Sequence, residues 1–293
     1  MRVDSAAGPL QGRTVLLTGA SAGIGLAAAR QLALLGAHLI LVCRDAGRGE
    51  QARAAVRLAA PRAPAPDLLL ADLAVQAEVH RLSDAILARY PRLDVLINNA
   101  GVLPHQLITT ADGHELCWAT NHLAPFILTN RLLPLLEAAG PGARVITVAS
   151  EAHWIGEIEA TAAARANANR SSAFTAYCDS KLANILFTKA LADRLELTGI
   201  TAHCLHPGIV RSNLWSHSSW LLRLLMAGAQ PFARSCERAA ETITYLATLP
   251  QAAQANGHYF KNKRVARVSS RAANRAEIHR LWRISVEETG VGE

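Results

Sequence analysis

Tyr177 and Lys181 stand four residues apart in a segment with the composition of a helix, so we expect their side chains to share one face. A phenol that acts as acid or base near neutral pH needs a pKa below its ordinary value of about 10. An ammonium about 5 Å away, at an effective dielectric constant of about 20, lowers that pKa by roughly two units. The pair therefore predicts a group that can exchange a proton, whereas Asp179 should point to another face, at the surface.

Ser150 and Asn121 could serve the same chemistry. Ser150 ends an apolar run, where its hydroxyl could bind a carbonyl together with Tyr177, or could simply cap a turn. Asn121 lies in a long helical segment, four residues before Pro125. Because proline has no N–H, the carbonyl of Asn121 lacks its helical donor and can hold a water molecule.

A glycine-rich loop precedes these residues, in the run Thr18-Gly-Ala-Ser-Ala-Gly-Ile-Gly25 between an expected strand and an expected helix. Gly19 permits a tight turn, and the later glycines let the backbone approach a pyrophosphate at the helix N-terminus. The loop predicts a dinucleotide site. Its expected contacts are Gly19, Ser21, Gly23, Ile24 and Gly25.

Short apolar runs alternate with helical segments and must position this chemistry. We expect strands at residues 13–18, 38–42, 67–70, 93–97, 143–148, 201–205 and 258–260. We expect helices at residues 23–36, 45–60, 75–90, 112–139, 174–197, 235–249 and 273–288. The pattern predicts a single α/β domain over residues 1–293, a doubly wound Rossmann fold with a mostly parallel sheet flanked by helices. Ligands of such sheets bind at the carboxyl ends of the strands.

The strand ends carry further motifs. Asn98-Asn-Ala-Gly101 ends one strand, and Asp72-Leu73 follows another. With the Thr-Gly-x-x-x-Gly-x-Gly loop and Tyr-x-x-x-Lys, the chain resembles the short-chain dehydrogenase/reductase superfamily. The resemblance implies that Asn121, Ser150, Tyr177 and Lys181 form the catalytic tetrad. It also implies cofactor contacts from Asp72, Leu73, Asn99, Ala100, Gly101, Pro207, Gly208 and Val210, besides Tyr177 and Lys181.

The resemblance implies a role for each tetrad residue. Tyr177 is the acid or base, and Ser150 orients the carbonyl. Lys181 lowers the Tyr177 pKa and binds the ribose, and Asn121 holds a relay water.

The sequence around the tetrad residues narrows the resemblance to the retinol-dehydrogenase-like branch of the superfamily. It is carried by Asn121-His-Leu-Ala-Pro-Phe, by residues 176–184, by His206-Pro-Gly208 and by Gly257-His-Tyr-Phe, and it extends over residues 10–289. Ala149 stands where the branch usually has a second serine, and Ser212 where many members have a cofactor-binding threonine. We expect no membrane anchor of the kind that several retinol dehydrogenases carry. The resemblance also implies a homodimer or homotetramer.

The end of the second strand indicates the cofactor. A carboxylate there favours NAD(H), whereas an arginine suits the 2′-phosphate of NADP(H). The usual acidic position falls on Cys43, and Arg44 follows it, with Arg48 one turn later. Asp45 is the counter-argument, although we expect it to cap the next helix. We predict NADP(H) in preference to NAD(H).

A substrate lid is expected at residues 209–233. Within it, Trp215-Ser-His-Ser-Ser-Trp-Leu-Leu-Arg-Leu-Leu-Met226 is almost wholly apolar after its first residues. Such a wall favours a small hydrophobic carbonyl or alcohol, such as an aliphatic aldehyde or a retinoid- or steroid-like molecule. The alternative is that these side chains only pack the lid onto the domain or onto a partner subunit.

Composition limits the remaining classes. The 293 residues are 51% hydrophobic, which excludes a disordered chain. No run approaches the roughly 18 apolar residues of a membrane span, and the N-terminus lacks a signal peptide. Five scattered cysteines argue against a disulfide framework and favour the cytoplasm. The net charge of +7 is spread along the chain without a nucleic-acid module, so no nucleic-acid partner is expected.

The histidines do not predict a metal site. His203 and His206 are three residues apart in an expected strand and so lie on opposite faces. His105, His122 and His153 are expected to make polar contacts near the mouth of the cleft. We therefore predict no metal.

These features together predict an NADP(H)-dependent oxidoreductase that interconverts a carbonyl and an alcohol. One alternative is a non-catalytic NADP(H)-binding redox sensor or scaffold on the same fold. A sugar-nucleotide epimerase is a further alternative, which the lack of a separate substrate domain opposes.

Overall fold

A computed structural model describes residues 8–159, 161, 172–208, 210, 234–250 and 252–292. Its strands are β1 (Thr14–Thr18), β2 (His38–Cys43), β3 (Asp67–Leu70), β4 (Val95–Asn98), β5 (Arg144–Val148), β6 (Thr201–His206), β7 (Tyr259–Lys261) and β8 (Arg264–Val265). Its α-helices are α1 (Gly23–Leu34), α2 (Ala46–Ala59), α3 (Gln76–Arg89), α4 (Leu116–Trp118), α5 (Ala124–Ala139), α7 (Ala173–Arg194), α9 (Cys236–Thr248), α10 (Ser270–Ala273) and α11 (Arg275–Thr289).

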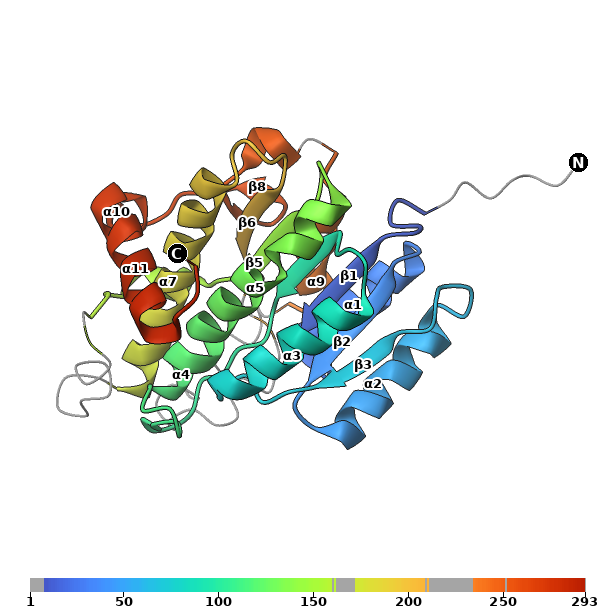
Figure 1. Cartoon of the computed structure of the whole chain (residues 1–293), viewed down its shortest axis with the longest axis horizontal. Coiled ribbons are helices and arrows are strands. Elements are labelled where there is room, and N and C mark those ends of the chain that lie inside the picture. The colour runs from blue at the N-terminus through green and yellow to red at the C-terminus, as the bar shows by residue number, and fades with distance from the viewer. Residues whose placement is uncertain are drawn as a thin grey trace, which may run out of the picture.

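The strands form one eight-stranded sheet in the order β3-β2-β1-β4-β5-β6-β7-β8. All neighbours from β3 to β7 are parallel, and β8 returns antiparallel beside β7. Helices lie on both faces of the sheet (Figure 1). The predicted doubly wound fold is therefore confirmed. Because β1 and β4 are neighbours although β2 and β3 intervene in sequence, the chain reverses direction between them, and the ligand crevice of such folds opens at that point.

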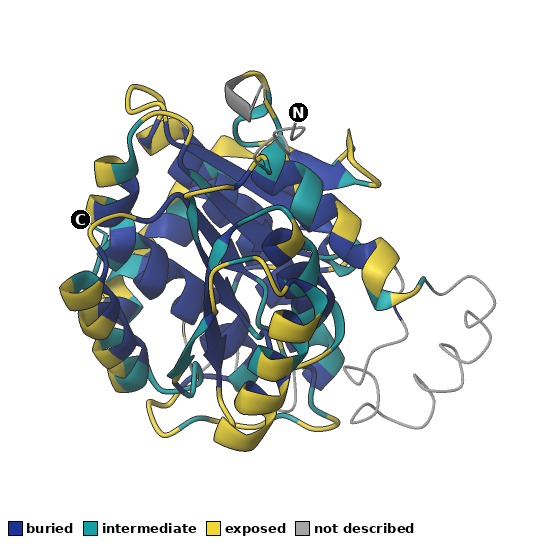
Figure 2. Cartoon of the chain, turned by 90° about the vertical axis from the view of Figure 1, so that its right-hand side faces the viewer, coloured by how far each residue is buried: buried dark blue, intermediate teal, exposed yellow. Residues whose placement is uncertain are grey.

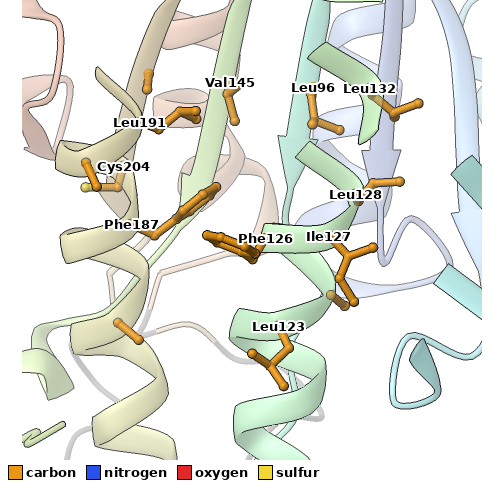
Figure 3. Packing of buried hydrophobic residues seen from close by; sticks show 14 of the residues in the cluster. Leu96, Leu123, Phe126, Ile127, Leu128, Leu132, Val145, Phe187, Leu191 and Cys204 are labelled. Atoms are coloured by element: carbon orange, nitrogen blue, oxygen red, sulfur yellow. The ribbon is translucent and has the colours of Figure 1, made fainter. Parts of the chain in front are cut away.

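Two apolar layers hold the helices on the sheet. Alternate strand residues point to opposite faces, so Leu16 packs under α3, α5 and α7 while Leu17 packs under α1 and α9. Figure 2 shows the strands buried between helices whose outer faces are exposed. Phe126 of α5 and Phe187 of α7 meet at 5.6 Å between ring centroids, in the same buried cluster as Leu96 and Val145 (Figure 3). This contact fixes α7 beside α5, and α7 carries two of the predicted catalytic residues.

The structure differs from the expected helix at residues 112–139. The helical path begins at α4, passes through a π-helical turn, η1 (Ala119–Leu123), and continues as α5. Ala124 donates its N–H to the carbonyl of Ala119, five residues back. Pro125 cannot donate to Asn121, so the wider turn forms where the regular ladder is interrupted. The disturbance expected at Asn121 is therefore present, in a form that the sequence pattern does not specify.

The C-terminal region also differs from the expectation. The helix expected at 273–288 is divided into α10 and α11 at Asn274, whose side chain accepts from the N–H of Ala276 at 2.9 Å and caps α11. The strand β8 was not expected. It follows a turn in which Asn262 and Lys263 both have positive φ.

Among the residues that the structure describes, no helix is both long and apolar enough to cross a membrane.

Candidate active site

The glycine loop and the Asn98–Gly101 motif pack directly on one another. Gly19 has a φ of +67°, and a Cβ there would lie 2.8 Å from the Cα of Ala100. A Cβ on Gly25 would lie 2.1 Å from the carbonyl oxygen of Gly19. Asn99 donates from Nδ2 to the carbonyls of Thr18 at 2.8 Å and Gly19 at 3.3 Å. The close approach that the sequence predicts for these glycines is thus a packing requirement of the loop itself.

The N-terminus of α1 is open to a ligand. Its N-cap is Ala22, whose methyl side chain cannot accept a hydrogen bond from the first N–H groups of the helix. By contrast, Asp45, Ser172 and Ser235 cap α2, α7 and α9 with their side chains. Unpaired N–H groups and a positive helix end attract an anion. Together with the glycine cradle, this end of α1 fits a phosphate group.

The residues expected near the adenosine half of the cofactor lie at neighbouring strand ends. Cys43 pairs with Leu70 in the register of β2 and β3, which brings Arg44 and Asp72 to the same edge of the sheet. Burial raises the pKa of the Cys43 thiol to about 11. Arg44 is exposed. Asp45 accepts from the N–H of Arg48 at 2.8 Å and caps α2, as predicted.

Asp72 and Leu73 have different surroundings. Asp72 accepts from the N–H of Ala74 at 3.0 Å, which forms a local turn after β3. Leu73 is partly buried against the apolar layer under α3, α5 and α7.

The side chain of Asn121 is fully engaged. Its Oδ1 accepts from the N–H of Val102 at 2.8 Å, and its Nδ2 donates to the Val102 carbonyl at 3.1 Å and to Ser180 Oγ at 3.0 Å. The Ser180 hydroxyl donates to the Tyr177 carbonyl at 2.7 Å. Asn121 therefore clamps the segment after β4 to the helix that carries Tyr177. Sequence reasoning missed Ser180, although a helical serine three residues after a site residue can bond back to its carbonyl.

Ser150, Tyr177 and Lys181 meet at the end of β5. Ser150 hydrogen-bonds the Tyr177 hydroxyl and also accepts from the N–H of Ala152 at 3.2 Å, so it caps the turn after β5 and lies beside Tyr177. Lys181 Nζ donates to the Val148 carbonyl at 2.9 Å and lies 5.6 Å from the Tyr177 ring centroid. The structure thus brings all four predicted tetrad residues together.

The electrostatics of the pair differ from the expectation. Burial raises the pKa of Tyr177, and the hydrogen bond from Ser150 opposes this shift only in part. Burial lowers the pKa of Lys181 to about 8. The expected lowering of the Tyr177 pKa by Lys181 is therefore not what these surroundings give, because removal of the phenol from water is the larger effect.

Asp179 and two of the three histidines are not where the sequence placed them. Asp179 is buried rather than at the surface, and accepts from the N–H of Glu157 at 2.7 Å. His122 lies in the interior beside Ser285 Oγ, at 2.8 Å. His153 is also buried, beneath Ser150. Only His105 of the three expected near the cleft mouth is exposed.

The end of β6 leads into residues that are only partly described. Gly208 has a φ of +94°, and a Cβ there would lie 2.9 Å from the Cδ of Arg234. Val210 forms an isolated parallel bridge with Arg234. Pro207 is half-buried between β6 and this bridge in the sequence. The rest of the expected lid, including Ser212, lies outside the described residues.

Comparison with known proteins agrees with this geometry. The family model described as short chain dehydrogenase matches residues 13–220. The chain belongs to the short chain dehydrogenase family. Human retinol dehydrogenase 12 is 40% identical over 282 residues, which cover 96% of this chain and 88% of the relative. Human retinol dehydrogenase 14 is 38% identical over 302 residues, which cover 97% and 88%. These relatives place the chain in the retinol-dehydrogenase-like branch, as its motifs indicated.

Solved structures share the fold. An uncharacterized protein from Mycobacterium paratuberculosis aligns with a TM-score of 0.77 and 31% identity, covering 98% of this chain and 97% of that one. A short chain dehydrogenase from Escherichia coli, solved with NADPH, aligns with a TM-score of 0.65. It is 24% identical and the match covers 88% of this chain and 99% of that one, a likeness that shows the fold alone.

Membership of this family makes the chain an oxidoreductase that acts on the alcohol or carbonyl group of a small molecule, with a nicotinamide cofactor. The preference for NADP(H), the roles of the tetrad residues, the cytoplasmic location and the homodimer or homotetramer stay predictions.

Proposed function

We propose that this protein is an NADP(H)-dependent oxidoreductase that interconverts a hydrophobic carbonyl compound and its alcohol. The observation that carries the proposal is the cluster of buried Asn121, Tyr177 and Lys181 with half-buried Ser150, at the strand ends beside a helix N-terminus without a side-chain cap. When bound, the nicotinamide supplies or accepts the hydride. The chain's own groups bind, orient and exchange the proton.

Tyr177 exchanges that proton with the substrate oxygen. Burial raises the pKa of the phenol, so the group is neutral at physiological pH and carries the proton that a carbonyl reduction consumes. The Ser150 hydroxyl accepts from the N–H of Ala152 and bonds the Tyr177 hydroxyl, and its single hydrogen would turn to a substrate carbonyl when one is bound. Lys181 would bind a ribose hydroxyl of the cofactor. Gly101 leaves room there, since a Cβ on it would lie 3.4 Å from Lys181 Nζ.

Asn121 serves the proton path through its main chain. Its side-chain amide is committed to Val102 and Ser180, so the group left for a relay water is the carbonyl, to which Pro125 offers no N–H.

The preference for NADP(H) rests on the end of β2. Arg44 is an exposed cation there, and Cys43 offers no carboxylate to a ribose 2′-hydroxyl. Asp45, the nearest acid in sequence, uses one carboxylate oxygen to cap α2. A 2′-phosphate is therefore attracted rather than repelled at this edge.

The preference for a hydrophobic substrate rests on the apolar side chains around Tyr177. Leu103, Cys117 and Ala176 form one buried cluster with its ring, and Val102, Leu107 and Ala152 pack against that cluster while remaining partly exposed. An apolar wall beside a few hydrogen-bonding groups is typical of sites for small lipophilic molecules. Aliphatic, retinoid- and steroid-like carbonyls fit this description.

Substitution of Tyr177 by Phe tests the proposal. We expect Tyr177→Phe to bind NADPH like the wild type but to lose nearly all turnover, because only the proton donor is removed. NADPH oxidation is measured over a panel of aldehydes, ketones, steroids and retinoids, and NADPH binding by fluorescence titration. Tyr245→Phe, on α9 at the opposite face of the sheet, is the matched control. Turnover of Tyr177→Phe within tenfold of wild type, about 1.4 kcal/mol, would contradict the assignment.

A further inference from the structure

His153 makes two hydrogen bonds that define its protonation. Its Nδ1 lies 2.7 Å from the Ser150 carbonyl oxygen, and its Nε2 lies 3.2 Å from the backbone nitrogen of Ser269. A backbone N–H can only donate, so Nε2 must be the acceptor. In a neutral imidazole the proton then sits on Nδ1, which donates it to Ser150. The ring therefore links α10, which Ser269 caps, to the residue that follows β5.

The bond from His153 completes the fixation of the Ser150 main chain. The same carbonyl accepts from the N–H of His153 at 3.3 Å, so two donors occupy its lone pairs. On the same peptide unit, the N–H of Glu151 donates to His206 Nδ1 at 3.4 Å. With this peptide unit held at both its carbonyl and its N–H, the main chain directly after Ser150 is fixed. Ser150 Oγ then reaches Tyr177 from a backbone that has little freedom.

The surroundings of His153 keep the ring neutral and in place. Its ring packs at 5.2 Å from the rings of Trp154 and Tyr259. Burial lowers its pKa, although Glu151 nearby opposes this. Tyr259 and Lys261 take the two carboxylate oxygens of Glu151, at 2.7 and 2.9 Å. The carboxylate is thus engaged elsewhere and does not draw a second proton onto the imidazole.

We propose that His153 is a positioning residue of the reaction: its Nδ1–H holds the Ser150 carbonyl, and through it the hydroxyl that meets Tyr177 and the substrate. This inference rests on the proposed function, since it gives His153 a part in the same site. It differs from a merely structural role in one respect. Loss of the Ser150 bond should lower kcat at unchanged KM for NADPH, whereas loss of the Ser269 bond alone should lower stability.

Two substitutions separate the two bonds. Asn carries an N–H donor as many bonds from Cα as Nδ1 does, so His153→Asn can still reach Ser150 but not Ser269. Gln carries an acceptor at the distance of Nε2, so His153→Gln can accept from Ser269 and loses the Ser150 bond. We expect His153→Asn to keep kcat within about threefold of wild type, and His153→Gln to lose at least tenfold, with both melting at lower temperature. Equal kcat values for the two variants would overturn the proposal.

A matched control and a second pair guard against a general effect of losing a buried imidazole. His203 is equally buried, and bonds Ala255 and Thr201 rather than a tetrad residue. We expect His203→Gln to lose stability without a fall in kcat.

Ser269 has a φ of −61°, which proline can adopt. Both Ser269→Pro and Ser269→Ala remove the α10 cap, but only proline removes the N–H that selects the tautomer. We expect the proline variant to melt at a lower temperature than the alanine variant but to keep a similar kcat, because the Nδ1–H bond to the Ser150 carbonyl is left in place. A kcat at least tenfold lower would count against the proposal even if the His153 variants do not fold.

The outcomes also distinguish this inference from the proposed function. If the wild type turns over no carbonyl compound and Tyr177→Phe changes nothing, the proposed function fails. If Tyr177→Phe and Ser150→Ala abolish turnover while His153→Gln retains the wild-type kcat, the function stands and His153 is structural only.

Discussion

Asp179 provides a quantitative test of the interior of α7. Its side chain is 4% exposed, and burial raises its carboxyl pKa from 3.8 to about 7, with the nearby acids Glu157, Glu159 and Glu115 adding to the shift. The folded pKa lies above the unfolded one, so between about pH 4 and 7 the native state holds a proton that the unfolded chain has released. Stability is therefore present at low pH and is lost as pH rises through this window. A shift of about three units corresponds to roughly 4 kcal/mol.

Asp179→Asn removes the charge and keeps an oxygen that can accept from the N–H of Glu157. We expect the variant to match the wild type near pH 4 and to be more stable at pH 8 by up to about 4 kcal/mol, or on the order of 10 °C in Tm. Urea unfolding at several pH values measures the difference. Asp84→Asn is the control, because Asp84 is exposed and pairs with Arg131 at the surface; we expect a change below about 1 kcal/mol there. A gain that does not grow with pH, or a loss at pH 8, would refute the reasoning.

Three further predictions concern the ligands. Arg44→Asp should raise KM for NADPH far more than KM for NADH, because it replaces attraction to the 2′-phosphate by repulsion; equal effects would remove the argument for NADP(H). Gly25→Ala should abolish cofactor binding or folding, because its Cβ would lie 2.1 Å from the Gly19 carbonyl oxygen, whereas Gly47→Ala, with its nearest contact at 3.5 Å, should be tolerated. With linear aldehydes, kcat/KM should rise severalfold per carbon, up to about 0.8 kcal/mol per methylene, until the site is full. A flat profile would mean that the apolar groups around Tyr177 are structural.

The order of elements and the position of the site could be read from the sequence because both follow from general geometry. Apolar runs separated by helical segments permit few arrangements other than a parallel sheet with helices on both faces. The carboxyl ends of parallel strands meet at one edge, so Gly19, Asn99 and Ser150 had to be neighbours once β1, β4 and β5 were recognised. Spacing within one helix likewise put Tyr177 and Lys181 on a common face.

The environment of each group could not be read in this way. Asp179 should have faced solvent if α7 were a surface helix, but α11 covers α7 from one side and the loop at Gly156 from another. A Cβ on Gly156 would lie 2.5 Å from the Cys178 carbonyl oxygen, which shows how closely that loop packs against α7. A helix buried nearly all round has no outward face for periodicity to reveal. The direction of the Tyr177 pKa shift was wrong for the same reason, since the pattern shows the nearby ammonium but not the loss of water.

The partners of the tetrad residues explain why motifs indicate the site but not its supports. Lys181 donates to the carbonyl of Val148, and Asn121 bonds both main-chain groups of Val102. His153 reaches the carbonyl of Ser150. Main-chain groups are nearly the same in every residue and are placed by the path of the backbone, so any residue other than proline that adopts the same backbone conformation can stand at 102 or 148 without altering these bonds. The supports of the site are therefore side chains that bind the main chain, and Ser180 and His153 are such side chains just as Asn121 and Lys181 are.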